Sequence, residues 1–272
     1  SEELLNLLAQ LPKLHVIART SSFSFKGKEA DIATIARTLN VAHVLEGSVR
    51  KSGDTVRITV QLIRASDSTH LWSQTYDRKL NDVFKVQDEI ARAVVAALQV
   101  KLLPAEREHL AAAPTVNAEA YDAYLKGLYH WYRLTREDLD AAERYFNLAL
   151  SKDPDYARAH AGIGLLWMGR NQMGFSSPAD GVPKAKAAAI KAVELDDSLP
   201  DAHYVLAIVY TWADWNWPAA EREFRRAIEL NPGFADAHIY YSHFLSIMRR
   251  PDEAMAEAKR ALELDPFNGL FR

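Results

Sequence analysis

Two copies of one pattern, placed 34 residues apart, constrain this chain more than any other feature. The first copy reads AEREFRRAIELNP and ends at Pro232, and the second reads AMAEAKRALELDP and ends at Pro266. Small residues match as well, since Ala220 in the first copy corresponds to Ala254 in the second. A fixed period of this size predicts an all-α solenoid of stacked helical hairpins.

Counting back from Pro266 gives four repeats, over residues 117–154, 155–197, 198–232 and 233–266. The fourth is regular, and the third carries one additional residue near Trp215. The second is expanded, because NQMGFSSPADG separates its two predicted helices by about nine residues more than a tight turn needs. After Pro266 only FNGLFR remains. We therefore expect an apolar face at that end of the array, in need of a cover.

In the first helix of a repeat, a bulky residue is followed four positions later by a small one, as in His203 with Ala207 and His238 with Ser242. Together with the period, these positions make residues 117–272 resemble tetratricopeptide repeats. That resemblance implies helix–turn–helix units whose first helices line a groove for a protein or peptide segment. The implied groove positions here are Arg158, Ala161, Leu165, Asp201, Tyr204, Ile208, Asp236, Ile239 and His243.

The groove lacks the Lys/Asn carboxylate clamp of the chaperone-binding members of that family. Tyr204 and Ile239 stand where the clamp has Lys, and Ile208 and His243 stand where it has Asn. A mixed apolar and acidic groove fits an apolar or weakly basic segment. Trp212, Trp215 and Trp217 fall within six residues at one turn, which is more than a tight turn requires, so we expect at least one to be exposed to a partner.

The first part of the chain predicts an α+β domain with a mixed or antiparallel sheet and covering helices. Leucines in residues 2–11 predict a helix, 15–18 a short strand, and Asp31 the cap of a helix that stops at Asn40. Strict alternation in TVRITVQLI marks the middle of three antiparallel strands. An amphipathic helix over residues 81–103 should cover the sheet, and residues 104–116 form a linker.

Three separated motifs carry a second resemblance over residues 1–103, namely VIARTSSFSFKGK, VAHVLEGSVRKSGDTVRITVQLI and HLWSQTYDRKLNDVFKVQDEIA. They are similar to a bacterial accessory domain related to the N-terminal domain of TolB. That domain commonly precedes tetratricopeptide repeats in regulators that carry an adenylate/guanylate cyclase domain or a winged-helix DNA-binding domain. Its usual first strand is absent here. An open sheet edge invites pairing, so a homodimer through this edge, or through the end of the array, is a hypothesis.

No catalytic, cofactor or metal site is predicted. The chain has no cysteine, and its nine histidines form no His-Glu-x-x-His pair. His160, His203 and His238 share one repeat position and are interpreted as packing residues. Helix carboxylates such as Glu223 and Glu257 are interpreted as a solvated face. A net charge of −3 gives no case for nucleic acid, and no apolar run is long enough for membrane insertion.

These observations predict a non-catalytic interaction and regulatory module of a larger bacterial signalling protein, associated with a cyclase or a transcription regulator. A small-ligand sensor that controls a fused effector is the alternative, and a stand-alone enzyme is the least favoured hypothesis. The resemblance favours the cytoplasm, whereas an upstream membrane helix would imply the periplasm.

Overall fold

The computed structural model describes residues 2–53, 55–79, 83–100 and 117–271. The predicted linker at 104–116 lies outside these ranges. The chain divides into two compact units, which are described separately. Unit 1 comprises residues 1–114 together with 260–272, and unit 2 comprises residues 115–259.

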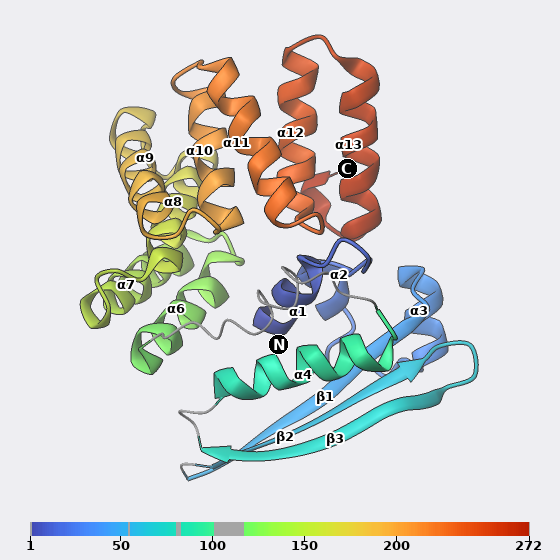
Figure 1. Cartoon of the computed structure of the whole chain (residues 1–272). Coiled ribbons are helices and arrows are strands. Elements are labelled where there is room, and N and C mark those ends of the chain that lie inside the picture. Colours follow the sequence, from blue (N-terminus) through green and yellow to red (C-terminus); the bar gives the residue numbers. More distant parts are fainter. Residues whose placement is uncertain (1, 54, 80–82, 101–116, 272) are drawn as a thin grey trace. The chain divides into compact units, whose positions relative to one another are not determined.

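Unit 1 contains the predicted antiparallel sheet, with its three strands in the order β1-β2-β3 (Figure 1). The strands are β1 (His43–Ser52), β2 (Thr55–Arg64) and β3 (Thr69–Lys79). The alternation in β2 has the expected effect, because Val56, Ile58, Val60 and Leu62 are all buried. β1 is an edge strand and most of it is exposed.

Two helices supply the other half of this core, α1 (Glu2–Ala9) and α4 (Val83–Ala97). Leu4 and Leu8 of α1 and Ile90 and Val94 of α4 pack in one cluster with the buried face of β2. The predicted cover of the sheet is therefore confirmed. The predicted end of α4 is wrong, because the helix closes at Ala97 with a hydrogen bond of 3.1 Å from the Val100 N–H to the Val95 carbonyl.

The strand predicted at residues 15–18 does not form, and a short helix, α2 (Arg19–Phe23), follows it. The Ala18 N–H of this segment does not pair with a neighbouring strand. It donates instead to the carbonyl of Leu264, far away in sequence, at 2.7 Å. The next prediction is confirmed. Helix α3 (Ile32–Leu39) is capped by Asp31, which accepts from the Thr34 N–H at 2.6 Å, and it ends at left-handed Asn40.

The end of the chain also belongs to unit 1. Ser21 is fully buried, and both its N–H and its hydroxyl donate to Oδ1 of Asp265, at 2.9 and 2.6 Å. The Phe267 N–H in turn donates to the Ser21 hydroxyl at 2.9 Å. Leu264 is fully buried and Phe271 is 9% exposed. The apolar end that we expected to need a cover is thus packed within unit 1.

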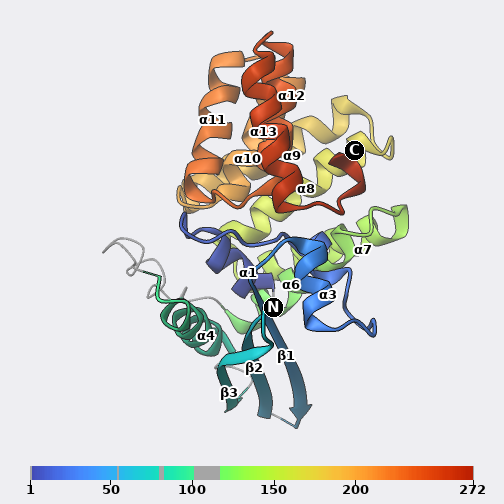
Figure 2. The ribbon, with the colours of Figure 1, turned by 90° about the vertical axis from the view of Figure 1, so that its right-hand side faces the viewer.

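Unit 2 consists of helical hairpins, as predicted (Figures 1 and 2). Its helices are α6 (Ala118–Trp131), α7 (Arg136–Lys152), α8 (Ala157–Gln172), α9 (Pro178–Leu195), α10 (Pro200–Trp212), α11 (Trp217–Leu230), α12 (Ala235–Ile247) and α13 (Pro251–Leu264), whose last residues belong to unit 1. Small residues allow the helices to approach closely, since Ala142, Ala185 and Ala220 are fully buried.

The expansion of the second repeat lies in its helices rather than in its loop, which corrects the predicted long separation. α8 has 16 residues and α9 has 18, against 13 and 14 in α10 and α11. The connection spans only residues 173–177. Ser177 explains the early start of α9, because its hydroxyl accepts from the Asp180 N–H at 3.2 Å and Pro178 occupies the first helical turn.

Each turn between the two helices of a repeat contains one residue with a left-handed backbone. These residues are Leu134, Gly174, Trp215 and Arg249, with φ of 53°, 71°, 52° and 57°. The turn therefore imposes this conformation in every repeat, although only the second repeat uses the glycine that adopts it without cost.

Candidate functional site

The nine predicted groove residues differ widely in exposure. Ala161, Tyr204, Ile208 and Ile239 are buried, with at most 7% of each residue exposed. Arg158, Leu165, Asp201 and Asp236 are half-buried, and His243 is exposed. The accessible surface of the first helices therefore lies at His243 and beyond it, toward the ends of α10 and α12.

Three rings are in contact there, and together with Ile247 we call them the aromatic strip: Trp212, Tyr240, His243 and Ile247. The Tyr240 ring lies 5.8 Å from the Trp212 ring and 5.7 Å from the His243 ring, measured between centroids, with edge-to-face geometry. Ile247 follows His243 by one helical turn on the same face of α12. Trp212 and Ile247 are 41% and 45% exposed, so both ends of the strip present apolar surface to solvent.

The strip is supported from below by buried aromatic packing. Tyr204 contacts the Tyr240 ring at 5.8 Å and the Phe234 ring at 5.1 Å. Burial raises the pKa of both Tyr204 and Tyr240, so both phenols stay neutral. The Tyr240 hydroxyl donates to Oε1 of Gln172 on α8 at 3.2 Å. Sequence reasoning missed Tyr240 because it is not one of the family's groove positions.

The three tryptophans of the α10–α11 turn have different surroundings. Trp217 is half-buried and packs against the core of unit 2. Trp215 is 70% exposed and has the left-handed backbone of its turn. A bulky residue is costly in that conformation, and a side chain this exposed gains little stabilisation from packing. Neither the turn nor the core of unit 2 explains a tryptophan at 215.

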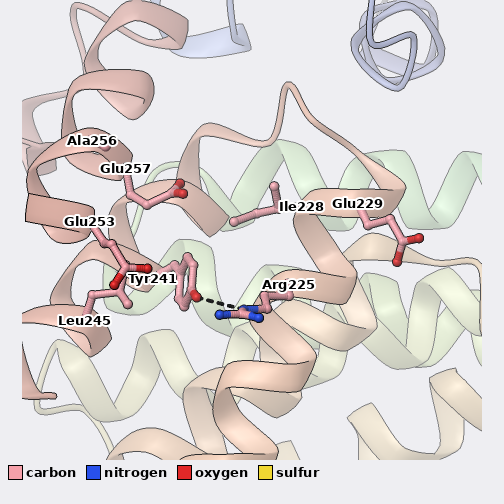
Figure 3. A pocket seen from close by; sticks show the side chains of 8 residues that line it. All are labelled: Arg225, Ile228, Glu229, Tyr241, Leu245, Glu253, Ala256 and Glu257. Carbon is pink, nitrogen blue, oxygen red and sulfur yellow. Dashed lines mark hydrogen bonds between the residues drawn. The ribbon is translucent and has the colours of Figure 1, made fainter. Parts of the chain in front are cut away.

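A separate hollow of about 440 Å³ lies between α11, α12 and α13 (Figure 3). Ile228, Leu245 and Ala256 give it an apolar floor, and the rim is charged. The rim charges are already paired within the protein. Arg225 donates to the Tyr241 hydroxyl at 3.1 Å, as Figure 3 shows, and to Glu221 at 2.6 Å. Glu253 binds Arg250.

The interpretation of the helix carboxylates as a solvated face is wrong for Glu223. This residue is 9% exposed, and its Oε2 lies 2.7 Å from Nδ1 of His203. Glu257 bonds His238 in the same way. The spacing of 20 and 19 residues from histidine to glutamate was the available signal. Within the described ranges, no group of three or more acidic and histidine side chains could hold a metal ion.

Comparison with known proteins gives a partial assignment. Residues 1–93 match the second domain of HilA/YgeH-like transcriptional regulators. The putative adenylate cyclase 3 of Rhizobium meliloti (strain 1021) is 37% identical over 214 residues, which cover 78% of this chain and 36% of the relative. The transcriptional regulator HilA of Salmonella typhimurium (strain LT2) is 22% identical over 237 residues, which cover 87% of this chain and 42% of the relative.

The chain thus spans less than half the length of either curated relative. Among solved structures, a thermophilic TPR protein of Thermus thermophilus aligns with a TM-score of 0.42 and 20% identity, over 54% of this chain and 75% of that chain. Among the described helices, none combines the length and the apolar character needed to cross a bilayer. The resemblance to the TolB N-terminal domain stays a prediction.

Proposed function

We propose that this chain is a non-catalytic interaction and regulatory module of a larger bacterial signalling protein, which acts in the cytoplasm. The observation that carries the proposal is the exposure of apolar side chains in unit 2, in the aromatic strip and separately at Trp215. Large apolar side chains are exposed there on the helices and, for Trp215, in the turn between α10 and α11, and aromatic side chains often anchor protein partners.

The geometry favours a protein or peptide segment with apolar side chains as the partner. Tyr240 is held by Tyr204 below it and by Gln172 beside it, so the strip loses little side-chain freedom on binding. The names of the two curated relatives support a cyclase or a transcription regulator as the fused effector. Because the chain spans less than half of each relative, that effector is part of the proposal.

The proposal is tested with a displayed peptide library selected on the intact chain. Trp215→Gly should weaken the binding of the selected peptides about thirtyfold, since a tryptophan at the centre of such an interface contributes about 2 kcal/mol to binding. The matched control is Arg249→Gly, which makes the same backbone change at the equivalent turn. Both variants should be stabilised by about 1 kcal/mol, because glycine adopts the left-handed conformation freely, but only the first should lose binding.

Trp212→Ala should also weaken binding, since it removes an exposed end of the strip. Peptides that bind Trp215→Gly and Trp212→Ala as tightly as the unchanged chain would show that neither Trp215 nor the strip is the docking site. A library that yields no binder at all would count against the interaction role itself.

The alternative role, a small-ligand sensor, would use the hollow of Figure 3. Its paired rim charges leave fewer groups to recognise a polar metabolite, which makes this role the weaker proposal. A thermal-shift screen decides it, because a ligand specific for the folded state raises the melting temperature. A stand-alone enzyme remains the least favoured hypothesis.

A further inference from the structure

His203, on the first turn of α10, has a hydrogen-bond acceptor at each ring nitrogen. Its Nε2 lies 3.0 Å from the carbonyl oxygen of Asp197, in the turn before α10. Its Nδ1 lies 2.7 Å from Oε2 of Glu223 on α11. His203 is only 3% exposed, so water has little access to either bond.

The same arrangement recurs one repeat later. His238 on α12 has Nε2 3.1 Å from the Pro232 carbonyl oxygen and Nδ1 2.5 Å from Oε2 of Glu257 on α13. His160, at the equivalent place in the second repeat, has only the carbonyl bond among the residues that the structure describes, at 2.9 Å from the Pro154 oxygen. The carboxylate contact is therefore an addition to the last two repeats rather than a requirement of the hairpin.

The two acceptors favour the doubly protonated form of the ring. A backbone carbonyl oxygen and a carboxylate can only accept, so each ring nitrogen must carry a proton to form both bonds. A neutral imidazole carries one proton and loses one of the two bonds. Only the imidazolium form of His203 can therefore donate both hydrogen bonds, one to the turn before α10 and one to α11.

We propose that the His203 imidazolium is a pH-sensitive clasp, which fastens the turn before α10 to helix α11 and releases one of these attachments when its proton passes to solvent. The charged groups that face the clasp are Glu223 and Asp197, whose carboxylate lies 3.5 Å from Nε2, together with Arg222, which pairs with Glu223 at 3.0 Å.

The direction of the pH effect follows from the electrostatics of the pair. Burial by itself would lower the pKa of His203, but the bonds to Glu223 and Asp197 outweigh it and raise the pKa above its ordinary value of 6.5. Stability from this group is therefore complete below the unfolded pKa and is lost as the pH rises through the higher folded value. Burial by itself would raise the pKa of Glu223, but the bond to His203 outweighs it and lowers this pKa. The stability that the Glu223 carboxylate contributes is therefore lost only in acid.

The test follows the His203 ring resonances of the intact chain by NMR during a pH titration. We expect Glu223→Gln to lower the pH at which His203 titrates. The amide of Gln can donate to a neutral Nδ1, so this variant keeps the hydrogen bond without the charge. The urea concentration at the midpoint of unfolding should fall as the pH rises from about 6 to 9 in the unchanged chain. The fall should be smaller in Glu223→Gln.

His160→Gln is the control, since no carboxylate of the described residues is recorded at His160, and it should keep the decline of the unchanged chain. The clasp is refuted if His203 titrates at the same pH with and without the Glu223 carboxylate. Should Glu223→Gln fail to fold, the titration of the unchanged chain still decides, because a midpoint for His203 below its ordinary value of 6.5 would contradict the proposal.

Discussion

Ser21 offers the sharpest test of how the end of the chain is held in unit 1. Its hydroxyl donates to Asp265 at 2.6 Å and accepts from the Phe267 N–H at 2.9 Å, and the residue has no exposed surface. Ser21→Ala removes both bonds without changing the backbone. Asp265, itself 3% exposed, would keep the Ser21 N–H but lose its shortest donor.

The expected cost follows from the two bonds. A hydrogen bond to a charged group contributes about 1.5–3 kcal/mol, and a neutral one contributes about 1 kcal/mol. Ser21→Ala should therefore destabilise unit 1 by about 2–4 kcal/mol. Ser22→Ala is the matched control, because its hydroxyl makes a single neutral bond of 2.8 Å to the Ile17 carbonyl and should cost about 1 kcal/mol or less.

Amide hydrogen exchange measures this local cost directly, because it reports the opening of individual bonds. The Ala18 and Phe267 N–H groups, which bond Leu264 and Ser21, should lose protection in Ser21→Ala and keep it in Ser22→Ala. Equal effects of the two substitutions, within about 0.5 kcal/mol, would refute the idea that the buried Asp265 contact anchors the end of the chain.

Two glycines of unit 2 give contrasting predictions. Gly127→Ala should cost about 1–3 kcal/mol in urea unfolding, because the new Cβ would lie 2.5 Å from the buried Phe146 ring; an unchanged midpoint would contradict this packing. Gly174→Ala meets nothing within 4 Å but has a φ of +71°, so it should cost about 1 kcal/mol through backbone strain alone. A cost for Gly174→Ala as large as that for Gly127→Ala would show that more than strain is involved.

The sequence predicted those features that depend on neighbours along the chain. Asp31 and Asn40 bracket α3 as expected, because a cap acts on backbone groups three or four residues away. The alternation of Val56, Ile58 and Val60 predicted the buried face of β2, since side chains alternate along any strand. The 34-residue period predicted the helical hairpins, because the two helices of a hairpin follow one another along the chain.

Predictions failed where a feature depends on a contact between distant residues. Residues 15–18 have strand-like composition, but Ala18 donates to Leu264 rather than to a neighbouring strand. Glu223 looked like a surface carboxylate until the fold placed it against His203. Trp212 and His243 were predicted as surface or groove residues, but their connection through Tyr240 was not, because Tyr240 and Trp212 lie on different helices.

By itself, then, the sequence determined that this chain combines a covered antiparallel sheet with stacked helical hairpins, because periodicity and caps are local. Only the tertiary structure decided which polar groups are buried and which aromatic residues stay exposed. Burial is a property of every element packed around a residue, and hydrogen bonds such as that between Ser21 and Asp265 join positions 244 residues apart.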